Sequence, residues 1–402
     1  MLNYPLATSS WDDSEIAAIQ AVVDSGMFTM GPYVAKFEEE FAAYVGSRYC
    51  VMVNSGSSAN LIAVAALFYR KENKLKRGDE VIVPAVSWAT TYYPLYQYGL
   101  KIKFVDIDAD TLNFDLNALQ DAITDNTRMI FAVNLLGNPN DFAAIESIIN
   151  GRDIILIEDN CESLAAEFQG KQAGTFGLMG TFSSFFSHHI STMEGGMVVT
   201  DDEELYHIAL SLRAHGWTRN LPKVNKVCGT KSDFSFEESF RFVLPGYNVR
   251  PLEMSGAIGL QQLKKLSDFI TTRRSNAQFF VEQFKDNPYL KIQKEIGRSS
   301  WFGFSLIINP NAPFTRRDIV SYLQAQGIEC RPVVGGNFAK NEVINYFDFE
   351  IHGELKNAEM IDSHGVFVGN HQYDCVELIK HLKTVTDTLL DKSTQLNEGN
   401  YV

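Results

Sequence analysis

Two adjacent histidines stand in the stretch GTFSSFFSHHISTMEGGMVVT, residues 180–200, between a Ser/Phe-rich run and a Gly-Gly turn. An unperturbed imidazole has a pKa of about 6.5, so histidine exchanges protons readily near neutral pH. His188 or His189 could therefore serve as a general base or acid. A histidine buried in the core is the alternative, since burial of this residue type is common.

A small-residue cluster follows the apolar run YCVMV. Gly56, Ser57 and Ser58 stand there, at the start of a helix-like apolar pattern. Backbone N–H groups and hydroxyls at a helix N-terminus can hold a phosphate group. Ser-Gly-Ser before a helix is more often only a cap, so the sequence leaves both interpretations open.

Two larger side chains follow the next apolar runs. Trp88 comes after VIVPAVS and could either stack on a flat ring or belong to the core. Asp159 ends the run IILIED, where an unpaired carboxylate would be costly, so it needs a cationic or N–H partner. Asp159 could be a helix cap or a salt-bridge partner, or it could keep a pyridine nitrogen protonated.

The elements that must position these residues form an alternating pattern. Helix-like segments, two of which Asp115 and Asp141 begin as caps, alternate with short strand-like runs. The strand-like runs cover residues 81–86, 102–107, 129–137, 154–159 and 181–186. This alternation predicts an α/β fold with a mostly parallel central sheet covered by helices. Ligands bind at the carboxyl ends of strands in such sheets, which is where the residues above stand.

The pattern changes near Pro245. A turn and a long helix are predicted in GYNVRPLEMSGAIGLQQL and the residues after it, and SWFGFSLII and ECRPVV read as later strands. We therefore predict an N-terminal segment and large domain over residues 1–245, and a smaller α+β domain over residues 246–402. The polar tail after about Lys392 is expected to fray.

Composition excludes several classes of function. The chain has 402 residues, 45% of them hydrophobic, so it can bury a large core. Its net charge of −14, without a long basic run, argues against a nucleic-acid partner. No apolar run approaches the about 20 residues that cross a bilayer, and no secretion signal stands at the N-terminus, so we expect no membrane association and a cytoplasmic location. Five scattered cysteines without a C-x-x-C pair predict neither a disulfide framework nor a metal site.

Taken together in this order, the phosphate cradle, aromatic residue, strand-end aspartate and late strand-to-loop segment resemble the sugar aminotransferase family of fold type I pyridoxal-phosphate enzymes. These enzymes act on nucleotide-linked keto sugars. The resemblance runs from SSWDDSEIAAIQ through NSGSSANL, EDNCES and RAHGW to GYNVRPLEMSGAIGLQQL, which covers nearly the whole chain. It implies an aspartate aminotransferase-like fold and pyridoxal phosphate, or pyridoxamine phosphate, as the cofactor.

The resemblance also implies a role for each site residue. Asp159 would pair with the pyridine nitrogen, Glu162 would touch the ring hydroxyl and Trp88 would stack on the ring. The residues that would hold the phosphate are Gly56, Ser57, Ser183 and Asn248.

Asn248 would reach the phosphate from a neighbouring subunit, which implies a homodimer with shared active sites. Three further residues, His215, Arg219 and Arg331, are candidates for binding anionic groups of the substrates, because guanidinium groups pair well with carboxylates and phosphates. Surface salt bridges are the alternative for both arginines.

One residue of the family pattern is missing. A lysine six residues before the glutamate of EGG forms a Schiff base with the cofactor in the family, and counting back from Glu194 places His188 there. The closest lysines along the chain are Lys171 and Lys223. Imidazole forms no stable Schiff base, so we expect a cofactor held without a covalent bond. His188 is then the expected general base, and His189 is expected to be structural.

This replacement, with the flanking SHHISTMEGG, resembles the dehydratases within the family, which remove the hydroxyl at carbon 3 of a 4-keto-6-deoxy sugar. The resemblance implies GDP-linked 4-keto-6-deoxymannose, on the route to colitose, as the sugar substrate. L-Glutamate would be the amino donor, and 2-oxoglutarate and ammonia would be released.

The sequence opposes three other functions. The missing lysine opposes a nucleotide-sugar aminotransferase, and the scattered cysteines oppose an iron–sulfur-dependent 3-dehydrase of the same family. A non-catalytic ligand-binding relative would be expected to have lost other site residues as well. Asp159, Trp88, Ser183 and Asn248 are all in place.

Overall fold

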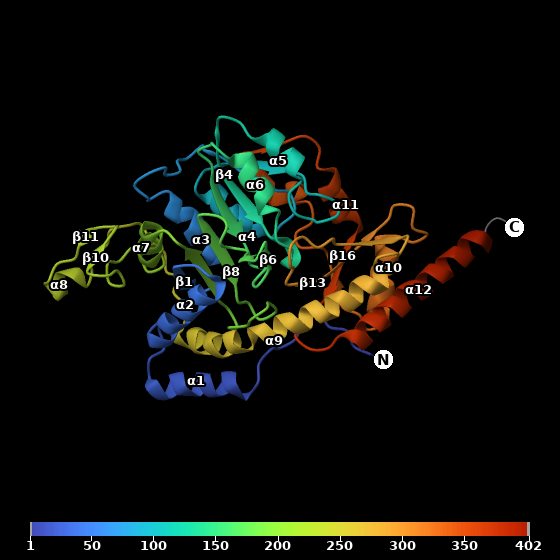
Figure 1. Cartoon of the computed structure of the whole chain (residues 1–402), viewed down its shortest axis with the longest axis horizontal. Helices are drawn as coiled ribbons and strands as arrows, with labels where there is room; N and C mark the ends of the chain where they lie inside the picture. Colours follow the sequence, from blue (N-terminus) through green and yellow to red (C-terminus); the bar gives the residue numbers. More distant parts are fainter. Residues whose placement is uncertain (1, 400–402) are drawn as a thin grey trace.

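An eight-stranded sheet lies at the centre of the computed structural model, which describes residues 2–399 (Figure 1). The strand order is β1-β9-β8-β5-β4-β2-β3-β15, and every neighbouring pair from β8 to β15 is parallel. The strands are β1 (Tyr49–Val53), β2 (Glu80–Pro84), β3 (Lys101–Val105), β4 (Thr127–Val133), β5 (Ile155–Asp159), β8 (Met179–Ser183), β9 (Gly196–Thr200) and β15 (Phe349–Ile351). The predicted α/β class with a mostly parallel sheet is confirmed.

The helices between these strands cover the sheet. They are α3 (Gly56–Leu67), α4 (Ala89–Gln97), α5 (Leu116–Ala122), α6 (Phe142–Ile149) and α7 (Glu203–Leu212). Asp115 and Asp141 accept hydrogen bonds from backbone N–H groups in the first turns of α5 and α6, so both predicted caps are confirmed. The run predicted as one strand over 129–137 ends at Val133, because η1 (Leu135–Gly137) follows it as a 3-10 turn.

A layer of three helices supports the β1 side of the sheet (Figure 1). It consists of α1 (Asp13–Ser25), α2 (Pro32–Val45) and the long α9 (Glu253–Phe284). A Cβ atom on Gly256 would stand 2.6 Å from the backbone nitrogen of Val34, so glycine is needed for α9 to approach α2 this closely. The fully buried Glu253 accepts hydrogen bonds from the N–H groups of Gly31 and Tyr33 and thereby fixes the start of α2.

A smaller antiparallel sheet follows α9. Its order is β12-β13-β16-β14, and the strands are β12 (Leu290–Ile292), β13 (Gly303–Ile308), β14 (Cys330–Arg331) and β16 (Gly365–Gly369). The helices of this part are α10 (Arg316–Ala325), η2 (Phe338–Lys340), η3 (Glu342–Tyr346), α11 (Lys356–His364) and α12 (Val376–Gly399). Strand β15 leaves this part to pair with β3 in the large sheet. The domain boundary between residues 245 and 246 stays a proposal.

The C-terminal tail corrects one expectation. The predicted fraying after Lys392 is wrong for the described part, because α12 continues as a helix to Gly399. Its earlier turns pack on the small sheet through Ile379 and Leu382. Adding residues to a helix that is already nucleated costs little, so polar residues can extend it into solvent. The last residues, 400–402, lie outside the described residues.

An arm between α7 and α9 extends away from the body at the left of Figure 1. It contains the short strands β10 (Val224–Asn225) and β11 (Gly229–Thr230) and the helix α8 (Ser235–Glu238). Four of its phenylalanines are strongly exposed, namely Phe234, Phe236, Phe240 and Phe242. A second small hairpin pairs β6 (Glu167–Phe168) with β7 (Lys171–Gln172). Within residues 2–399, no helix is long and apolar enough to span a membrane.

Candidate active site

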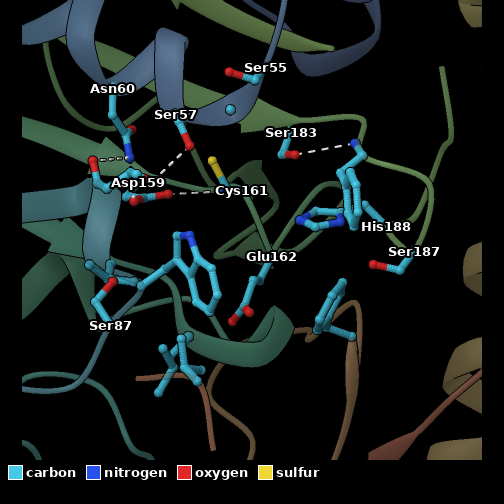
Figure 2. A pocket seen from close by; sticks show the side chains of 18 of the residues that line it. Ser55, Ser57, Asn60, Ser87, Asp159, Cys161, Glu162, Ser183, Ser187 and His188 are labelled. Carbon is cyan, nitrogen blue, oxygen red and sulfur yellow. Dashed lines mark hydrogen bonds between the residues drawn. The ribbon is translucent and has the colours of Figure 1, made fainter. Parts of the chain in front are cut away.

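A pocket of about 280 Å³ lies at the carboxyl ends of the central strands. Figure 2 shows Asp159, Glu162 and His188 around this cavity, with Ser57 and Ser183 close by. The pocket brings together most of the residues that the sequence singled out. Those that line it are Gly56, Ser57, Trp88, Asp159, Glu162, Ser183, His188 and Arg331.

Asp159 is held by three hydrogen bonds at the end of β5. Its carboxylate accepts from Asn60 Nδ2 at 2.8 Å, from Thr91 Oγ1 at 2.7 Å and from the backbone N–H of Cys161 at 3.1 Å. Asn60 is fixed in turn, because its Oδ1 accepts from Thr181 Oγ1 at 2.6 Å. The strand-end carboxylate therefore has the N–H and hydroxyl donors that its burial requires, and its orientation toward the pocket is set by α3 and α4.

The N-terminus of α3 opens into the same pocket. Ser55 caps this helix by accepting a hydrogen bond from the N–H of Ser58, and Gly56 and Ser57 line the cavity. A Cβ atom at Gly56 would stand 2.7 Å from the Cβ of Ser183 and 2.9 Å from the Sγ of Cys161. Only glycine fits here, and the exposed N–H groups and the two serine hydroxyls make a cradle for an anion.

His188 lies between aromatic rings on the opposite wall. Its ring centroid is 5.0 Å from that of Phe302 and 5.9 Å from that of Phe185. Within the part of the chain that the structure describes, its Nδ1 is buried and has no hydrogen-bond partner. Loss of hydration lowers the pKa of His188 to about 3, and the positive charge of Arg331 acts in the same direction. The imidazole is therefore neutral near pH 7 in the ligand-free pocket.

The side chain of His189 does not line the cavity. It is 1% exposed, and its Nε2 stands 3.2 Å from the carbonyl oxygen of Ser300. Its ring packs on Phe302. This position suits the structural role expected for the second histidine of the pair.

Three more residues complete the lining. Glu162 accepts a hydrogen bond from the N–H of Leu136, and removal from solvent raises the pKa of its carboxyl to about 6, against the opposing effect of Arg331. The guanidinium of Arg331 lies 4.6 Å from the ring centroid of Phe367 and faces the pocket. Trp88 is 57% exposed at the start of α4, so it is not a core tryptophan.

Three predicted residues do not line the pocket of the same chain. Asn248 pairs with Ala214 in an isolated bridge, and its Oδ1 accepts from Arg250 Nε at 2.9 Å. His215 packs against Trp217 at the root of the arm, and the guanidinium of Arg219 lies 5.0 Å from the ring centroid of Trp217. The geometry of a single chain therefore leaves these three residues away from the cavity.

Sequence reasoning missed the residues that support Asp159 and His188. Asn60 stands alone as a polar residue in an apolar helix, and this was the available signal for a buried hydrogen-bonding role. Thr91 and Phe302 gave no comparable signal, because each lies in a segment with other polar or aromatic residues. Further lining residues that went unnoticed are Ser55, Ser87, Thr90, Asn134, Ser187 and Val334.

Comparisons with known proteins agree with the family that the sequence resembles. Residues 9–375 match the DegT/DnrJ/EryC1/StrS aminotransferase family. The chain is 64% identical over 386 residues to GDP-4-keto-6-deoxy-D-mannose 3-dehydratase of Escherichia coli O55:H7, a match that covers 96% of this chain and 100% of that protein.

Two solved structures of GDP-4-keto-6-deoxymannose-3-dehydratase are similarly close. One is an H188N mutant with bound GDP-perosamine, and the other contains a trapped PLP-glutamate geminal diamine. Each has a TM-score of 0.94 and 64% identity, and each match covers 95% of this chain and 100% of the other.

The environment of His188 predicts an unusual titration. Because its folded-state pKa lies below the ordinary value, the imidazole should stay neutral from pH 8 down to about pH 5 in the ligand-free protein. Histidine NMR spectra recorded across this range would show it, with a His188→Asn variant to identify the signal. A His188 signal that protonates with a midpoint near 6.5 would contradict the described enclosure.

Proposed function

The chain belongs to the DegT/DnrJ/EryC1/StrS aminotransferase family, and on that premise we propose that it is a pyridoxal-phosphate-dependent 3-dehydratase of a GDP-linked sugar. It converts GDP-4-keto-6-deoxymannose to GDP-4-keto-3,6-dideoxymannose. This reaction is a step in the biosynthesis of deoxysugars for lipopolysaccharide. The observation that carries the proposal is that, among the described residues, His188 and no lysine lies at the wall of a pocket that Asp159, Trp88 and Ser183 also line. The 64% identity to a dehydratase of this name over the whole length of that protein supports it.

The overall reaction balances with glutamate as the second substrate. The sugar gains two electrons and two protons at carbon 3 and loses its hydroxyl as water. Glutamate supplies those electrons, and with one water it becomes 2-oxoglutarate and ammonia. The net change is the loss of one oxygen atom from the sugar.

The pocket residues fit pyridoxal phosphate or pyridoxamine phosphate. Gly56, Ser57 and Ser183 line the cavity at the N-terminus of α3, so the backbone N–H groups there, with the hydroxyls of Ser57 and Ser183, would hold the phosphate. Asp159 would hold a proton on the pyridine nitrogen, because its carboxylate is fixed by Asn60 and Thr91 and faces the cavity. When bound, the cofactor supplies a reversible carrier for the amino group and an electron-withdrawing ring.

Two further residues would orient the ring. Trp88 would stack on its face, since this side chain is exposed at the rim of the cavity and not packed in the core. Glu162 would accept a hydrogen bond from the ring hydroxyl, because its carboxyl is held at the cavity wall by the N–H of Leu136. These contacts take the place of a covalent bond in fixing the cofactor.

His188 would move the protons of the reaction. Its imidazole is neutral in the unliganded pocket, so one ring nitrogen is free to accept a proton from carbon. A pKa of about 3 describes a weak base, but anionic ligands beside the ring raise it, since a nearby negative charge favours the protonated form. The protonated imidazole would then give its proton to the hydroxyl that leaves carbon 3.

Arg331 is the candidate for an anionic group of a substrate. Its guanidinium faces the cavity beside His188, and its Nε is buried without a hydrogen-bond partner within residues 2–399. A carboxylate of glutamate or a phosphate of the nucleotide sugar would satisfy it.

A second subunit would complete the site. Asn248 lies outside the pocket of its own chain, which agrees with the expectation that it acts from a neighbouring subunit. His215 and Arg219, expected to bind anionic groups of the substrates, also lie outside the pocket of their own chain. Exposed apolar side chains also lie at the cavity and on the loop that carries His188: Trp88 and Phe185 line the cavity and are 57% and 36% exposed, and Phe186 and Met193 on the loop are 47% and 49% exposed. Exposed apolar patches of this kind mark contact surfaces, so we propose a homodimer with composite sites. We propose the cytoplasm as its compartment, where the five free thiols remain reduced.

The reaction products test the proposed function. Purified protein incubated with pyridoxal phosphate, L-glutamate and GDP-4-keto-6-deoxymannose should give a sugar lighter by one oxygen atom, with 2-oxoglutarate and ammonia in equal amounts. Mass spectrometry of the sugar and enzymatic assays of the two small products would measure this. The His188→Asn variant should be slower by a factor of about 10² to 10⁴, the usual contribution of a general base. An amino sugar as product would instead establish an aminotransferase.

Mixed dimers test the shared site. Subunits of His188→Asn and Asn248→Ala, each impaired alone, should recover activity after exchange, because one of the two sites in each heterodimer contains both native residues. Equal mixing should restore about a quarter of the wild-type rate, since half of the dimers are mixed.

A matched control uses two defects in the same pocket. Mixing His188→Asn with Asp159→Asn should restore nothing, because both sites of the heterodimer are then damaged. If exchange is confirmed by mass spectrometry and the first mixture stays inactive, Asn248 does not act across the subunit boundary.

A further inference from the structure

The loop that carries His188 has a buried segment, residues 189–192, with exposed residues before and after it. It connects β8 to β9, and Phe185 and Phe186 at its tip are 36% and 47% exposed. The four residues after His188 are buried, with exposed fractions of 3% or less. His188 therefore lies at the junction between a tip without close packing and a segment that the rest of the molecule holds.

Ser191 is the residue of that segment whose backbone is held by side chains from distant parts of the chain, in addition to the contacts of His189 with Ser300 and Phe302. Its N–H donates to Gln262 Oε1 at 3.0 Å, and its carbonyl oxygen accepts from the indole Nε1 of Trp11 at 2.9 Å. Both backbone polar groups of one residue are thus bonded to side chains from distant parts of the chain. Ser191 stands three residues after His188, so its position limits where the imidazole can lie.

Gln262 is fixed on every side. It lies on α9, is fully buried, and donates from Nε2 to the carbonyl oxygen of Ser10 and to Glu15 Oε1. Its Oε1 accepts from Ser10 Oγ in addition to the N–H of Ser191. An amide with all four hydrogen-bonding positions occupied has one orientation, so it holds Ser191 rigidly. Glu15 is itself anchored by Lys265.

The N-terminal segment that carries Trp11 is anchored at its far end as well. The side chain of Tyr4 is fully buried, and its hydroxyl donates to the carbonyl oxygen of Gly369 in the small sheet at 2.7 Å. The N–H of Tyr4 donates to the carbonyl oxygen of Gly327 at 2.8 Å. Residues 4–11 therefore form a strap from the small sheet to the His188 loop, and Trp11 is not part of a free tail.

We infer that Gln262 and Trp11 are positioning residues for His188, which act by holding the backbone of Ser191 from two sides. The inference rests on the proposed function in one respect, namely that His188 transfers the protons. Neither Gln262 nor Trp11 lines the cavity, so both act only through the loop. Proton transfer needs a base placed within hydrogen-bond reach, and a displacement of about 1 Å can cost as much as 10²-fold in rate.

Two conservative variants test the inference. Trp11→Phe keeps an aromatic ring and removes the N–H donor, and Gln262→Met keeps the length of the side chain and removes its hydrogen bonds. Both should accelerate amide hydrogen exchange in residues 184–195, measured by mass spectrometry on the dimeric protein. Both should lower kcat by about 10-fold, which is less than the 10²-fold loss that a displacement of about 1 Å can cause. Both should leave KM for glutamate within about twofold of the wild-type value.

Two control variants separate positioning from general destabilisation. Gln261→Met changes the neighbouring glutamine, whose side-chain oxygen accepts a hydrogen bond from Lys264 one turn along α9, and should alter neither readout. Tyr4→Phe removes one buried hydrogen bond at the far end of the strap but keeps the backbone hydrogen bonds of Tyr4 to Gly327 and Glu329, so it should lower the unfolding temperature without changing exchange in residues 184–195.

The inference would be overturned if Trp11→Phe left amide hydrogen exchange in residues 184–195 unchanged. It would also be overturned if Tyr4→Phe accelerated that exchange as much as Trp11→Phe does. Should Gln262→Met fail to fold, the Trp11→Phe measurement decides alone. The exchange readout does not depend on catalysis. A protein without dehydratase activity would therefore refute the proposed function and still show whether the loop is held in this way.

Discussion

The imidazole at position 188, packed between Phe185 and Phe302 at the pocket wall, is the constraint on which the rest of the site depends. An amine at this position would bond to an aldehyde cofactor, whereas an imidazole in an aromatic enclosure stays neutral and can only accept and donate protons. The cofactor must then be held by other contacts. In the proposed function, the helix N-terminus at Gly56 would hold the phosphate, the fixed carboxylate of Asp159 would pair with the ring nitrogen, and Trp88 at the rim would stack on the ring.

The sheet and the helices beside it bring these groups together at one edge. Parallel strands β5 and β8 end at the same edge of the sheet, so Asp159 and the loop after Ser183 meet there. Helix α3 begins at that edge and directs its N–H groups into the cavity. The close packing of α9 against α2, which requires glycine at position 256, brings Gln262 under the His188 loop. Catalytic geometry in this protein thus depends on contacts made by the N-terminal strap as well as by the sheet.

Much of this could be predicted from the sequence, and the remainder could not for physical reasons. The strands and the caps at Asp115 and Asp141 depend on local patterns, so they were found. Asn60, Thr91 and Gln262 escaped notice because their roles depend on how helices sit against strands far away in the sequence. The helical tail to Gly399 was missed because its polar residues carry no packing signal of their own. The place of Asn248 in a shared site depends on a second chain.

The most direct test of the central claim is to return a lysine to the pocket. A His188→Lys variant, purified with pyridoxal phosphate and treated with borohydride, should carry a stable covalent bond between the new side chain and the cofactor, visible as a mass increase on the peptide that contains position 188. The same treatment of the wild-type protein and of a His189→Lys variant should leave the peptide unmodified, because His189 faces Ser300 and not the cavity. Labelling of His189→Lys without labelling of His188→Lys would show that the wrong histidine has been assigned to the cofactor.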